Sequence, residues 1–376
     1  MDALTFLHHL QSQPSYAGQI VHVEHIPPRQ ADYAELDHPL VPELQECLQR
    51  QGLFPLYTHQ AEAVNKIREG KNVMVATSSA SGKTLCYNIA VAEALLSEPG
   101  SRALYLFPTK ALAQDQLRAL HKLLTPDLFQ VAELDTFDGD TPKEERAEIR
   151  KRARIILSNP DMLHVGILPN HQFWSRLLRH LRYVVVDEAH TYRGVFGSHV
   201  AGVLRRLRRL CRLYGSEPQF ICCSATIANP GELAEKLTGL PFRVVDNDGS
   251  PHGGKEFVFW NPPYLDDGQT RRAAHHEARK LLGYCVTQEY QTLCFTKSRK
   301  MAELIGMWVK RDLDSNHADL VDAVCSYRAG YLPEDRREIE KKLKRREITG
   351  VVTTNALELG IDIGSLDCVI MSGYPG

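Results

Sequence analysis

The sequence lacks the cysteine spacing of a zinc ribbon. Its nine cysteines include no pair separated by two residues, and Cys222 and Cys223 are direct neighbours inside an apolar run. Because a structural zinc site draws on closely spaced thiolates, this scatter argues against one and favours several small buried hydrophobes. The odd number of cysteines indicates free thiols in a reducing compartment, so we expect a cytoplasmic protein.

Long apolar runs are also missing. No stretch approaches the roughly 18 apolar residues that a membrane span needs, and the longest candidate, Ile89–Leu96, is interrupted by Glu93. Residues 1–13 carry two histidines and an acid, with no basic segment and no long apolar stretch. We therefore expect neither a secretory signal nor a membrane partner.

Neither sign of charge is in excess. The 45 basic and 46 acidic residues give a formal net charge of −1. A nucleic-acid partner would therefore have to bind a local groove rather than a generally basic chain. The 43% of hydrophobic and 24% of charged residues are typical of soluble α/β proteins, and 376 residues suffice for two or three domains. Composition leaves the oligomeric state open.

Two alternations of short apolar runs with helical periodicity predict the domain organisation. The runs within residues 51–246 are continuous, which is typical of a parallel sheet covered by helices on both faces. Residues 247–270 are rich in Gly, Pro, Asp and Asn and are predicted to be a linker. A second alternation fills residues 271–376, whereas residues 1–50 are an N-terminal accessory segment without assigned chemistry. The runs predicted as strands of the first sheet are Asn72–Ala76, Ala103–Phe107, Arg154–Leu157, Tyr183–Val186 and Gln219–Cys223.

A loop of small residues lies where the first of these strands gives way to a helix. Its residues are Thr77, Ser78, Ser79, Ala80, Ser81, Gly82, Lys83 and Thr84. This is the setting of a phosphate-binding loop, in which consecutive backbone N–H groups face the phosphates of ATP. Lys83 would reach the β- and γ-phosphates, and the Thr84 hydroxyl would bind Mg²⁺. The loop has Thr77 where the common motif has glycine, and the alternative is a plain turn before a helix.

Two adjacent acids follow the strand Tyr183–Val186. Asp187 and Glu188 stand at the carboxyl end of a buried parallel strand, where such sheets place their ligand sites. Asp187 can hold Mg²⁺ through water, and Glu188 can accept the proton of the water that attacks the γ-phosphate. His190 is better suited to a hydrogen bond across domains than to metal binding. The alternative is that the acids only cap the next helix.

These residues resemble motifs of a known family. Gly82-Lys83-Thr84 and Asp187–His190 resemble motifs I and II of the superfamily 2 helicases, and segments that resemble further motifs of that family occur in the family's order within residues 53–376. They are the Q motif at Tyr57–Gln60, motif Ia at Phe107–Leu112, the motif at Ser158–His164, motif III at Ser224–Thr226, motif IV at Phe295–Ser298 and motif V at Thr353–Asp362. The resemblance implies an α/β fold of two RecA-like domains with parallel sheets, of the P-loop NTPase type. The resemblance also implies that the second domain is incomplete and that the cofactors are ATP and Mg²⁺.

The resemblance also implies roles for single residues. Residues implied in nucleotide binding, besides the loop, are Tyr57, Gln60, Gly360 and Asp362, and residues implied in coupling are Ser224 and Thr226. Residues implied in nucleic-acid binding are Pro108, Thr109, Lys110, Asn159, Asp161, Thr296, Thr353 and Asn355. Thr109, Asn159 and Thr353 stand where a strand gives way to a helix, so free backbone N–H groups can contact phosphates. For each of the three, the alternative is a plain helix N-cap.

Within the superfamily, the chain is similar to the RecQ-related DNA-repair helicases of the MrfA type. Motif V reads Ala-Leu-Glu-Leu-Gly-Ile-Asp beside the Asp-Glu-Ala-His of motif II. The resemblance implies single-stranded DNA as the partner and movement from 3′ to 5′. The alternatives are an RNA helicase of the same superfamily and a nucleotide-gated nucleic-acid-binding module. The arginines of motif VI do not appear before Gly376, so we expect this chain to bind ATP and to hydrolyse it poorly.

Overall fold

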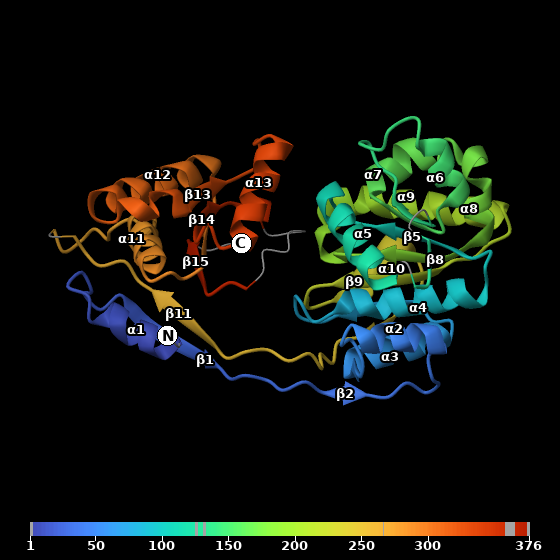
Figure 1. Cartoon of the computed structure of the whole chain (residues 1–376), viewed down its shortest axis with the longest axis horizontal. Helices are drawn as coiled ribbons and strands as arrows, with labels where there is room; N and C mark the ends of the chain where they lie inside the picture. Colours follow the sequence, from blue (N-terminus) through green and yellow to red (C-terminus); the bar gives the residue numbers. More distant parts are fainter. Residues whose placement is uncertain (1–2, 125–126, 131–132, 266, 358–364, 374–376) are drawn as a thin grey trace. The chain divides into compact units, whose positions relative to one another are not determined.

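Two parallel sheets organise the protein. The computed structural model describes residues 3–124, 127–130, 133–265, 267–357 and 365–373. Residues 28–253 form one compact unit, and residues 1–27 with 254–376 form the other (Figure 1). Each unit contains one all-parallel sheet with helices packed on it, which confirms the prediction of two RecA-like α/β domains. Over the described residues, no helix is both long and apolar enough to cross a membrane.

The larger unit is built on seven strands in the order β10-β4-β9-β8-β5-β7-β6, and every neighbouring pair is parallel. The strands are β4 (Val73–Ala76), β5 (Arg102–Leu106), β6 (Leu134–Thr136), β7 (Ile155–Ser158), β8 (Leu181–Val186), β9 (Gln219–Ser224) and β10 (Arg243–Val245). Successive side chains enter opposite cores: Val73 and Val75 belong to one, and Met74 to the other. Because both faces are buried, these strands appear in the sequence as continuous apolar runs.

Helices cover both faces of this sheet. One core joins the sheet to α2 (Pro42–Arg50), α3 (Thr58–Arg68), α4 (Lys83–Ser97) and α5 (Lys110–Leu124). The other core joins it to α6 (Arg146–Arg152), α7 (Pro160–Met162), α8 (Ser175–His180), α9 (Gly194–Leu213) and α10 (Pro230–Thr238), with short helices η2 (Leu163–Ile167), η3 (His171–Trp174) and η4 (Ala189–Thr191). Each fully buried Leu, Ile or Val side chain contributes about 1.5–3 kcal/mol. The two cores therefore hold every strand end at a defined position.

The smaller unit contains four parallel strands in the order β13-β14-β12-β15. They are β12 (Thr292–Thr296), β13 (Val324–Tyr327), β14 (Gly350–Thr353) and β15 (Cys368–Ser372). The core on one face includes α11 (Ala274–Thr287) and α12 (Arg299–Asn316), and the core on the other includes α13 (Pro333–Lys344). The short helices η5 (Ala318–Ala323) and η6 (Asn355–Leu357) complete the described elements of this sheet region.

The N-terminal residues divide between the two units, which differs from the predicted boundaries. β1 (Ile20–Ile26) pairs antiparallel with β11 (Lys255–Trp260), and Phe6 of α1 (Ala3–Gln11) packs on Tyr284 and Tyr290 with ring centroids 5.6 and 4.8 Å apart. Segments predicted as accessory and linker thus build part of the smaller unit. β1 is exposed at six of its seven positions, so no apolar pattern identifies it as a strand.

The rest of those two segments belongs to the larger unit. β2 (Tyr33–Ala34) pairs antiparallel with β3 (Leu56–Tyr57), immediately before α3. Close to this pair of strands, the backbone of Arg29 pairs with that of His252. Residues 28–50 and 247–253 are therefore folded against the larger sheet rather than forming a separate segment and a free linker.

Candidate functional site

The carboxyl ends of three neighbouring strands form the candidate site. β4 runs into the phosphate-binding loop, β9 into Ser224–Thr226 and β8 into Asp187, and the order β4-β9-β8 makes these strands adjacent. Parallel strands end at the same edge of a sheet, which is where doubly wound folds bind their ligands. Tyr87 and Asp187, 100 residues apart in the sequence, are therefore in hydrogen-bond contact.

The phosphate-binding loop has a shape that its own side chains and a glycine maintain. Gly82 has φ +80°, and a Cβ at this position would lie 2.6 Å from Nε2 of Gln60, so only glycine fits. The hydroxyls of Thr77 and Ser81 are 2.7 Å apart and buried at the base of the loop. This bond explains how threonine serves where the common motif has glycine: its hydroxyl closes the loop on itself.

Lys83 begins α4 and turns back over the loop. Its Nζ donates to the carbonyl oxygens of Thr77, at 3.1 Å, and Ser78, at 2.6 Å. The ammonium group therefore lies over the loop, where an anion held by the loop amides would meet it. Thr84 follows in the first turn of α4 and is half-buried.

The two acids after β8 are held at the same edge. Oδ2 of Asp187 accepts a hydrogen bond from the Tyr87 hydroxyl at 2.8 Å, and Oδ1 accepts one from the backbone N–H of Glu188 at 2.8 Å. Burial and the neighbouring charge of Glu188 raise the pKa of Asp187 to about 6. Burial also raises the pKa of Glu188, which has a left-handed backbone with φ +50°. A partly buried carboxylate with a raised pKa is suited to accept a proton near neutral pH.

Tyr87 is a site residue that sequence reasoning missed. It lies four residues after Lys83 on α4, a spacing that places both side chains on one face of the helix. Its ring packs edge-on against Tyr105 with centroids 5.1 Å apart, and it is fully buried. The i, i+4 spacing from Lys83 was the available signal. In sequence, however, a tyrosine in an apolar helix looks like an ordinary core residue.

The segments after β8 and β9 are linked through His190. Its Nδ1 accepts a hydrogen bond from the backbone N–H of Ala225 at 3.3 Å and lies 3.3 Å from Oε2 of Glu188. These contacts lie within the larger unit, whereas the prediction gave His190 a bond across domains. Ser224 is buried and donates to the carbonyl oxygen of Ala225 at 2.7 Å, and Thr226 is exposed.

The Q motif touches the loop directly. Oε1 of Gln60 accepts from the backbone N–H of Tyr57 at 3.0 Å, and its Nε2 donates to the carbonyl oxygen of Gly82 at 3.1 Å. Nε2 of the buried His59 lies 3.1 Å from the carbonyl oxygen of Ser81. Sequence reasoning assigned a role to Gln60 and passed over His59, whose bond to the loop no local pattern reveals.

The predicted nucleic-acid residues of the larger unit follow β5 and β7, which continue the same sheet edge. Oγ1 of Thr109 accepts from the N–H of Leu112 at 3.2 Å, and Oδ1 of Asn159 accepts from the N–H of Met162 at 2.7 Å. Both side chains thus act as helix caps, the alternative interpretation. Because these side-chain oxygens are used as caps, a phosphate would be contacted by backbone N–H groups of the same turns.

The neighbours of these two caps differ in their contacts. Lys110 pairs with Asp140 at 2.7 Å on the surface. Pro108 is half-buried and Asp161 is exposed. The Lys110–Asp140 pair is solvent-accessible, so an approaching phosphate could exchange with the carboxylate at little cost.

In the smaller unit, the predicted residues follow β12 and β14, which are adjacent. Thr296 ends β12, and Phe295 pairs in register with Thr353 at the end of β14. The buried Thr353 donates to the carbonyl oxygen of Thr354 at 2.9 Å, and Asn355 is exposed. Gly360 and Asp362, predicted to bind the nucleotide, lie outside the described residues.

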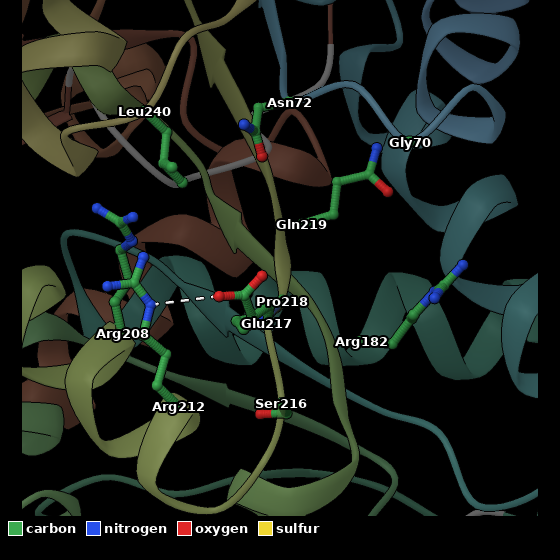
Figure 2. Close-up of a pocket in the computed structure, with 10 residues that line it drawn as sticks. All are labelled: Gly70, Asn72, Arg182, Arg208, Arg212, Ser216, Glu217, Pro218, Gln219 and Leu240. Atoms are coloured by element: carbon green, nitrogen blue, oxygen red, sulfur yellow. Dashed lines mark ion pairs between the residues drawn. The ribbon is translucent and has the colours of Figure 1, made fainter.

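A pocket of about 310 Å³ lies away from this site (Figure 2). It opens near the amino ends of the strands, beside Asn72 before β4 and Gln219 at the start of β9, with Arg208 and Arg212 from the end of α9 on its wall. Neither the phosphate-binding loop nor the acids Asp187 and Glu188 line it.

Within the described ranges, no group of three or more His, Cys, Asp or Glu side chains could hold a metal ion by itself. A divalent ion at Asp187 could take its other ligands from the Thr84 hydroxyl and from phosphate or water oxygens, which suits Mg²⁺.

Family models match both units. Residues 57–233 match the DEAD/DEAH box helicase model, and residues 275–376 match the helicase conserved C-terminal domain. The chain is 46% identical over 362 residues to the ATP-dependent helicase YprA of Bacillus subtilis, covering 95% of this chain and 47% of that protein. It is 45% identical over 373 residues to the ATP-dependent helicase HRQ1 of Saccharomyces cerevisiae, covering 97% of this chain and 34% of that protein. The chain thus spans about a third to a half of the length of these curated relatives.

Solved structures agree with the family models. A crystal structure of the helicase MrfA bound to DNA matches with a TM-score of 0.92 and 44% identity, covering 100% of this chain and 52% of that one. The helicase Lhr of Mycobacterium smegmatis, bound to ssDNA and AMP-PNP, matches with a TM-score of 0.70 and 25% identity, covering 88% of this chain and 44% of that one. The resemblance drawn from the motifs is confirmed. The chain belongs to the DEAD/DEAH box helicases of superfamily 2 and carries both RecA-like domains of their core.

Proposed function

We propose that this chain is the motor of an ATP-dependent DNA helicase, which couples ATP hydrolysis to movement along single-stranded DNA. One observation carries the proposal: the phosphate-binding loop and the acids Asp187 and Glu188 follow β4 and β8, the two strands that flank β9, and Tyr87 of the helix after the loop donates to Asp187. The loop supplies anion-binding backbone groups, and the acids supply a metal ligand and a base.

The residues of the loop and the acid pair divide the chemistry of hydrolysis between them. The backbone N–H groups of residues 79–84 and the Lys83 ammonium bind the β- and γ-phosphates. Thr84 and Asp187 would hold Mg²⁺, which would neutralise charge on the phosphate oxygens. Glu188 orients the attacking water and accepts its proton, and the raised pKa of this carboxyl makes it a better base.

Gln60 has the capacity to recognise adenine. A glutamine amide has two N–H donors and two acceptor positions, and one of each is used on Tyr57 and Gly82. One donor and one acceptor remain, which match N7 and the N6 amino group of adenine. We assign Tyr57 to the same end of the nucleotide, and a role for Gly360 and Asp362 in nucleotide binding is proposed from the family resemblance.

The nucleic-acid contacts are proposed along both sheet edges. In the larger unit they come from Pro108, Thr109, Lys110, Asn159 and Asp161, and in the smaller unit from Thr296, Thr353 and Asn355. Backbone N–H groups at strand-to-helix turns contact phosphates without reading bases, as a translocating motor requires. The DNA-bound MrfA and Lhr structures support DNA as the partner. Movement from 3′ to 5′ and a role in DNA repair are proposed from the family resemblance.

Coupling between the two ligands is proposed through Ser224, Thr226 and His190. The contact of His190 with Ala225 joins the segment that holds the acids to the segment after β9. A shift of Glu188 on hydrolysis would therefore reach Ser224–Thr226 through one side chain, since His190 also lies beside Glu188.

The test is nucleic-acid-stimulated ATP hydrolysis by the full-length protein. Single-stranded DNA should stimulate the rate several-fold more than RNA of the same sequence. Equal stimulation by RNA would favour an RNA helicase. No stimulation by either strand, together with intact ATP binding, would favour a nucleotide-gated binding module and contradict the motor.

A further inference from the structure

An acid outside the helicase motifs contacts the phosphate-binding loop. Asp248 follows β10 in a stretch that the sequence suggests is linker, and its side chain is 11% exposed. Its Oδ2 accepts a hydrogen bond from the backbone N–H of Ser78 at 3.1 Å and another from the Ser78 hydroxyl. Ser78 is the second residue of the loop, so a carboxylate from a distant segment holds the start of that loop.

The other carboxylate oxygen is held by the turn that Asp248 begins. Oδ1 accepts hydrogen bonds from the backbone N–H of Ser250 at 2.9 Å and from the Ser250 hydroxyl at 2.7 Å. Arg29 lies 3.1 Å from the same oxygen, and its guanidinium also donates to the carbonyl oxygen of Ser250 at 3.0 and 2.7 Å. The backbone pairing of Arg29 with His252 completes a rigid support behind the carboxylate.

The same turn also reaches the far end of the loop, through His59. Nε2 of His59 lies 3.1 Å from the carbonyl oxygen of Ser81, and Nδ1 lies 3.3 Å from the backbone N–H of Gly249. These partners require a neutral ring with the proton on Nε2, because Nδ1 must accept from an N–H. Burial, the largest influence, lowers the pKa of His59 and favours that form.

Glycine is needed at position 249 because the chain passes close to another segment. A Cβ there would lie 2.7 Å from the carbonyl oxygen of Asp32 and 2.9 Å from the backbone N of Thr58. No side chain could occupy that space without moving the backbone of the Q motif. Residues 248–250 are therefore fitted between the Q motif and the phosphate-binding loop.

Asp248 is ionised in this setting. Burial opposes its charge, but the hydrogen bonds from Ser78 and Ser250 outweigh burial and hold its pKa well below the usual range. An ionised carboxylate with charge-assisted bonds to two backbone N–H groups positions both strongly. Its charge is balanced by Arg29, so it can hold the loop without leaving a free negative charge beside it.

We propose that Asp248 is a positioning residue for nucleotide binding, which preorganises the phosphate-binding loop by holding Ser78 while the adjoining Gly249 and His59 hold Ser81. This inference rests on the proposed function, because it takes ATP as the ligand of the loop. Preorganisation lowers the cost of ordering the loop at the moment of binding. Asp248 itself need not touch the nucleotide, so its loss should weaken ATP binding more than it slows the chemical step.

The test compares Asp248→Asn with Glu93→Gln in the full-length protein. Both oxygens of Asp248 accept from backbone N–H groups, so either orientation of an asparagine amide sets an N–H₂ group against an N–H. Glu93 is the control because it forms a similarly buried ion pair with Arg68, at 2.7 Å, in the same unit but away from the loop. Ser250→Ala removes only one hydroxyl donor and serves if the asparagine variant does not fold.

We expect Asp248→Asn to raise both the KM for ATP and the nucleotide dissociation constant about tenfold, the effect of losing one charge-assisted hydrogen bond. The kcat should change about threefold or less, and Ser250→Ala should act in the same direction more weakly. Amide hydrogen exchange of residues 77–82, measured without nucleotide, should accelerate in Asp248→Asn and stay unchanged in Glu93→Gln.

Two outcomes would overturn the inference, and they can be told apart. If the wild type binds ATP and Asp248→Asn binds it equally well, with unchanged exchange in the loop, the positioning role is wrong and the proposed function stands. If the wild type does not bind ATP, the proposed function fails and the positioning role for ATP fails with it. The hydrogen-exchange result would then report only whether Asp248 orders the loop.

Discussion

The two parallel sheets differ in how far side-chain hydrogen bonds connect the turns at their carboxyl edges. In the larger unit, the turns after β4, β8 and β9 are tied to one another by side chains, through Tyr87 to Asp187 and through His190 to Ala225. In the smaller unit, the turns after β12 and β14 are adjacent, but the hydroxyl of Thr353 bonds only to the next residue along the chain.

This difference matches the ligands that we propose for each edge. A reaction at the γ-phosphate needs groups held to within a fraction of an ångström, because only preorganised groups stabilise a transition state without reorganisation. Backbone contacts to a moving strand must form and break at each step, so they gain nothing from a rigid network. We therefore expect substitutions in the turns after β4, β8 and β9 to impair catalysis or ATP binding strongly. Substitutions in the turns after β12 and β14 should weaken nucleic-acid binding modestly.

The largest effect at the carboxyl edge of the larger sheet is expected from removing the proposed base, Glu188. Glu188→Gln should lower the ATP hydrolysis rate by about 10²–10⁴-fold, because an amide cannot accept the proton of the attacking water. ATP affinity should stay within a factor of about three, since the residue acts on the water rather than on the phosphates. The measurement is steady-state hydrolysis beside nucleotide binding. Glu217→Gln, on a side chain that is 80% exposed, is the control. A wild-type rate in Glu188→Gln would remove the acid pair from the mechanism.

A smaller but still large effect is expected from the loop glycine. Gly82→Ala should weaken ATP binding about tenfold or more, because the new Cβ meets Gln60 at a position with φ +80°. Gly215→Ala is a matched control: its φ is +84°, and nothing lies within 4 Å of the added Cβ. Both variants should lower the melting temperature, and only the first should change ATP affinity. Equal ATP affinities for the two variants would mean that the loop tolerates the contact.

A moderate effect on the pH dependence of ATP hydrolysis is expected when Tyr87 loses its hydroxyl, and none when its core neighbour Tyr105 does. Tyr87→Phe removes the hydrogen bond that favours the ionised form of Asp187, so the pKa of Asp187 should rise above about 6 by roughly one further unit. A raised carboxyl pKa means more protonation as the pH falls, so kcat/KM should begin to decline at a higher pH than in the wild type. Tyr105→Phe loses a similarly buried bond to Asn88, at 3.1 Å, and should leave the pH profile unchanged. If the wild type, Tyr87→Phe and Tyr105→Phe gave the same pH profile, protonation of Asp187 would not be the cause of the decline in kcat/KM at low pH.

The smallest effect is expected at the carboxyl edge of the smaller sheet. Thr296→Ala should weaken single-stranded DNA binding about threefold, because one solvent-accessible hydroxyl contact to the strand is lost, and leave ATP affinity unchanged. Fluorescence anisotropy with a labelled strand and a nucleotide titration measure the two quantities. Thr287→Ala, at the end of α11, is the control, because its hydroxyl bonds only to the carbonyl oxygen of Tyr284 at 2.8 Å. A larger loss of ATP affinity than of DNA affinity would reverse our comparison of the two edges.

Much of the fold could be predicted from the sequence because it depends on the pattern of apolar residues within each segment. Both faces of the central strands are buried, and the predicted run Asn72–Ala76 became β4, Val73–Ala76, while Gln219–Cys223 became β9, Gln219–Ser224. The phosphate-binding loop and the acids after β8 were also found from sequence, because their residue types stand at the ends of such strands. Their distance from one another was not predicted by periodicity, and it follows from the order β4-β9-β8.

Contacts between distant segments needed the tertiary structure. β1 is exposed along most of its length, so only its backbone pairing with β11 identifies it as part of the smaller unit. Tyr87 looks like core, and Asp248 looks like linker, until folding brings each against a group far away in the chain. Hydrophobic periodicity records which face of an element is buried, a property of residues three or four apart. Which two elements meet depends on the packing of the whole sheet, and the contacts that position the groups of this site form between such elements.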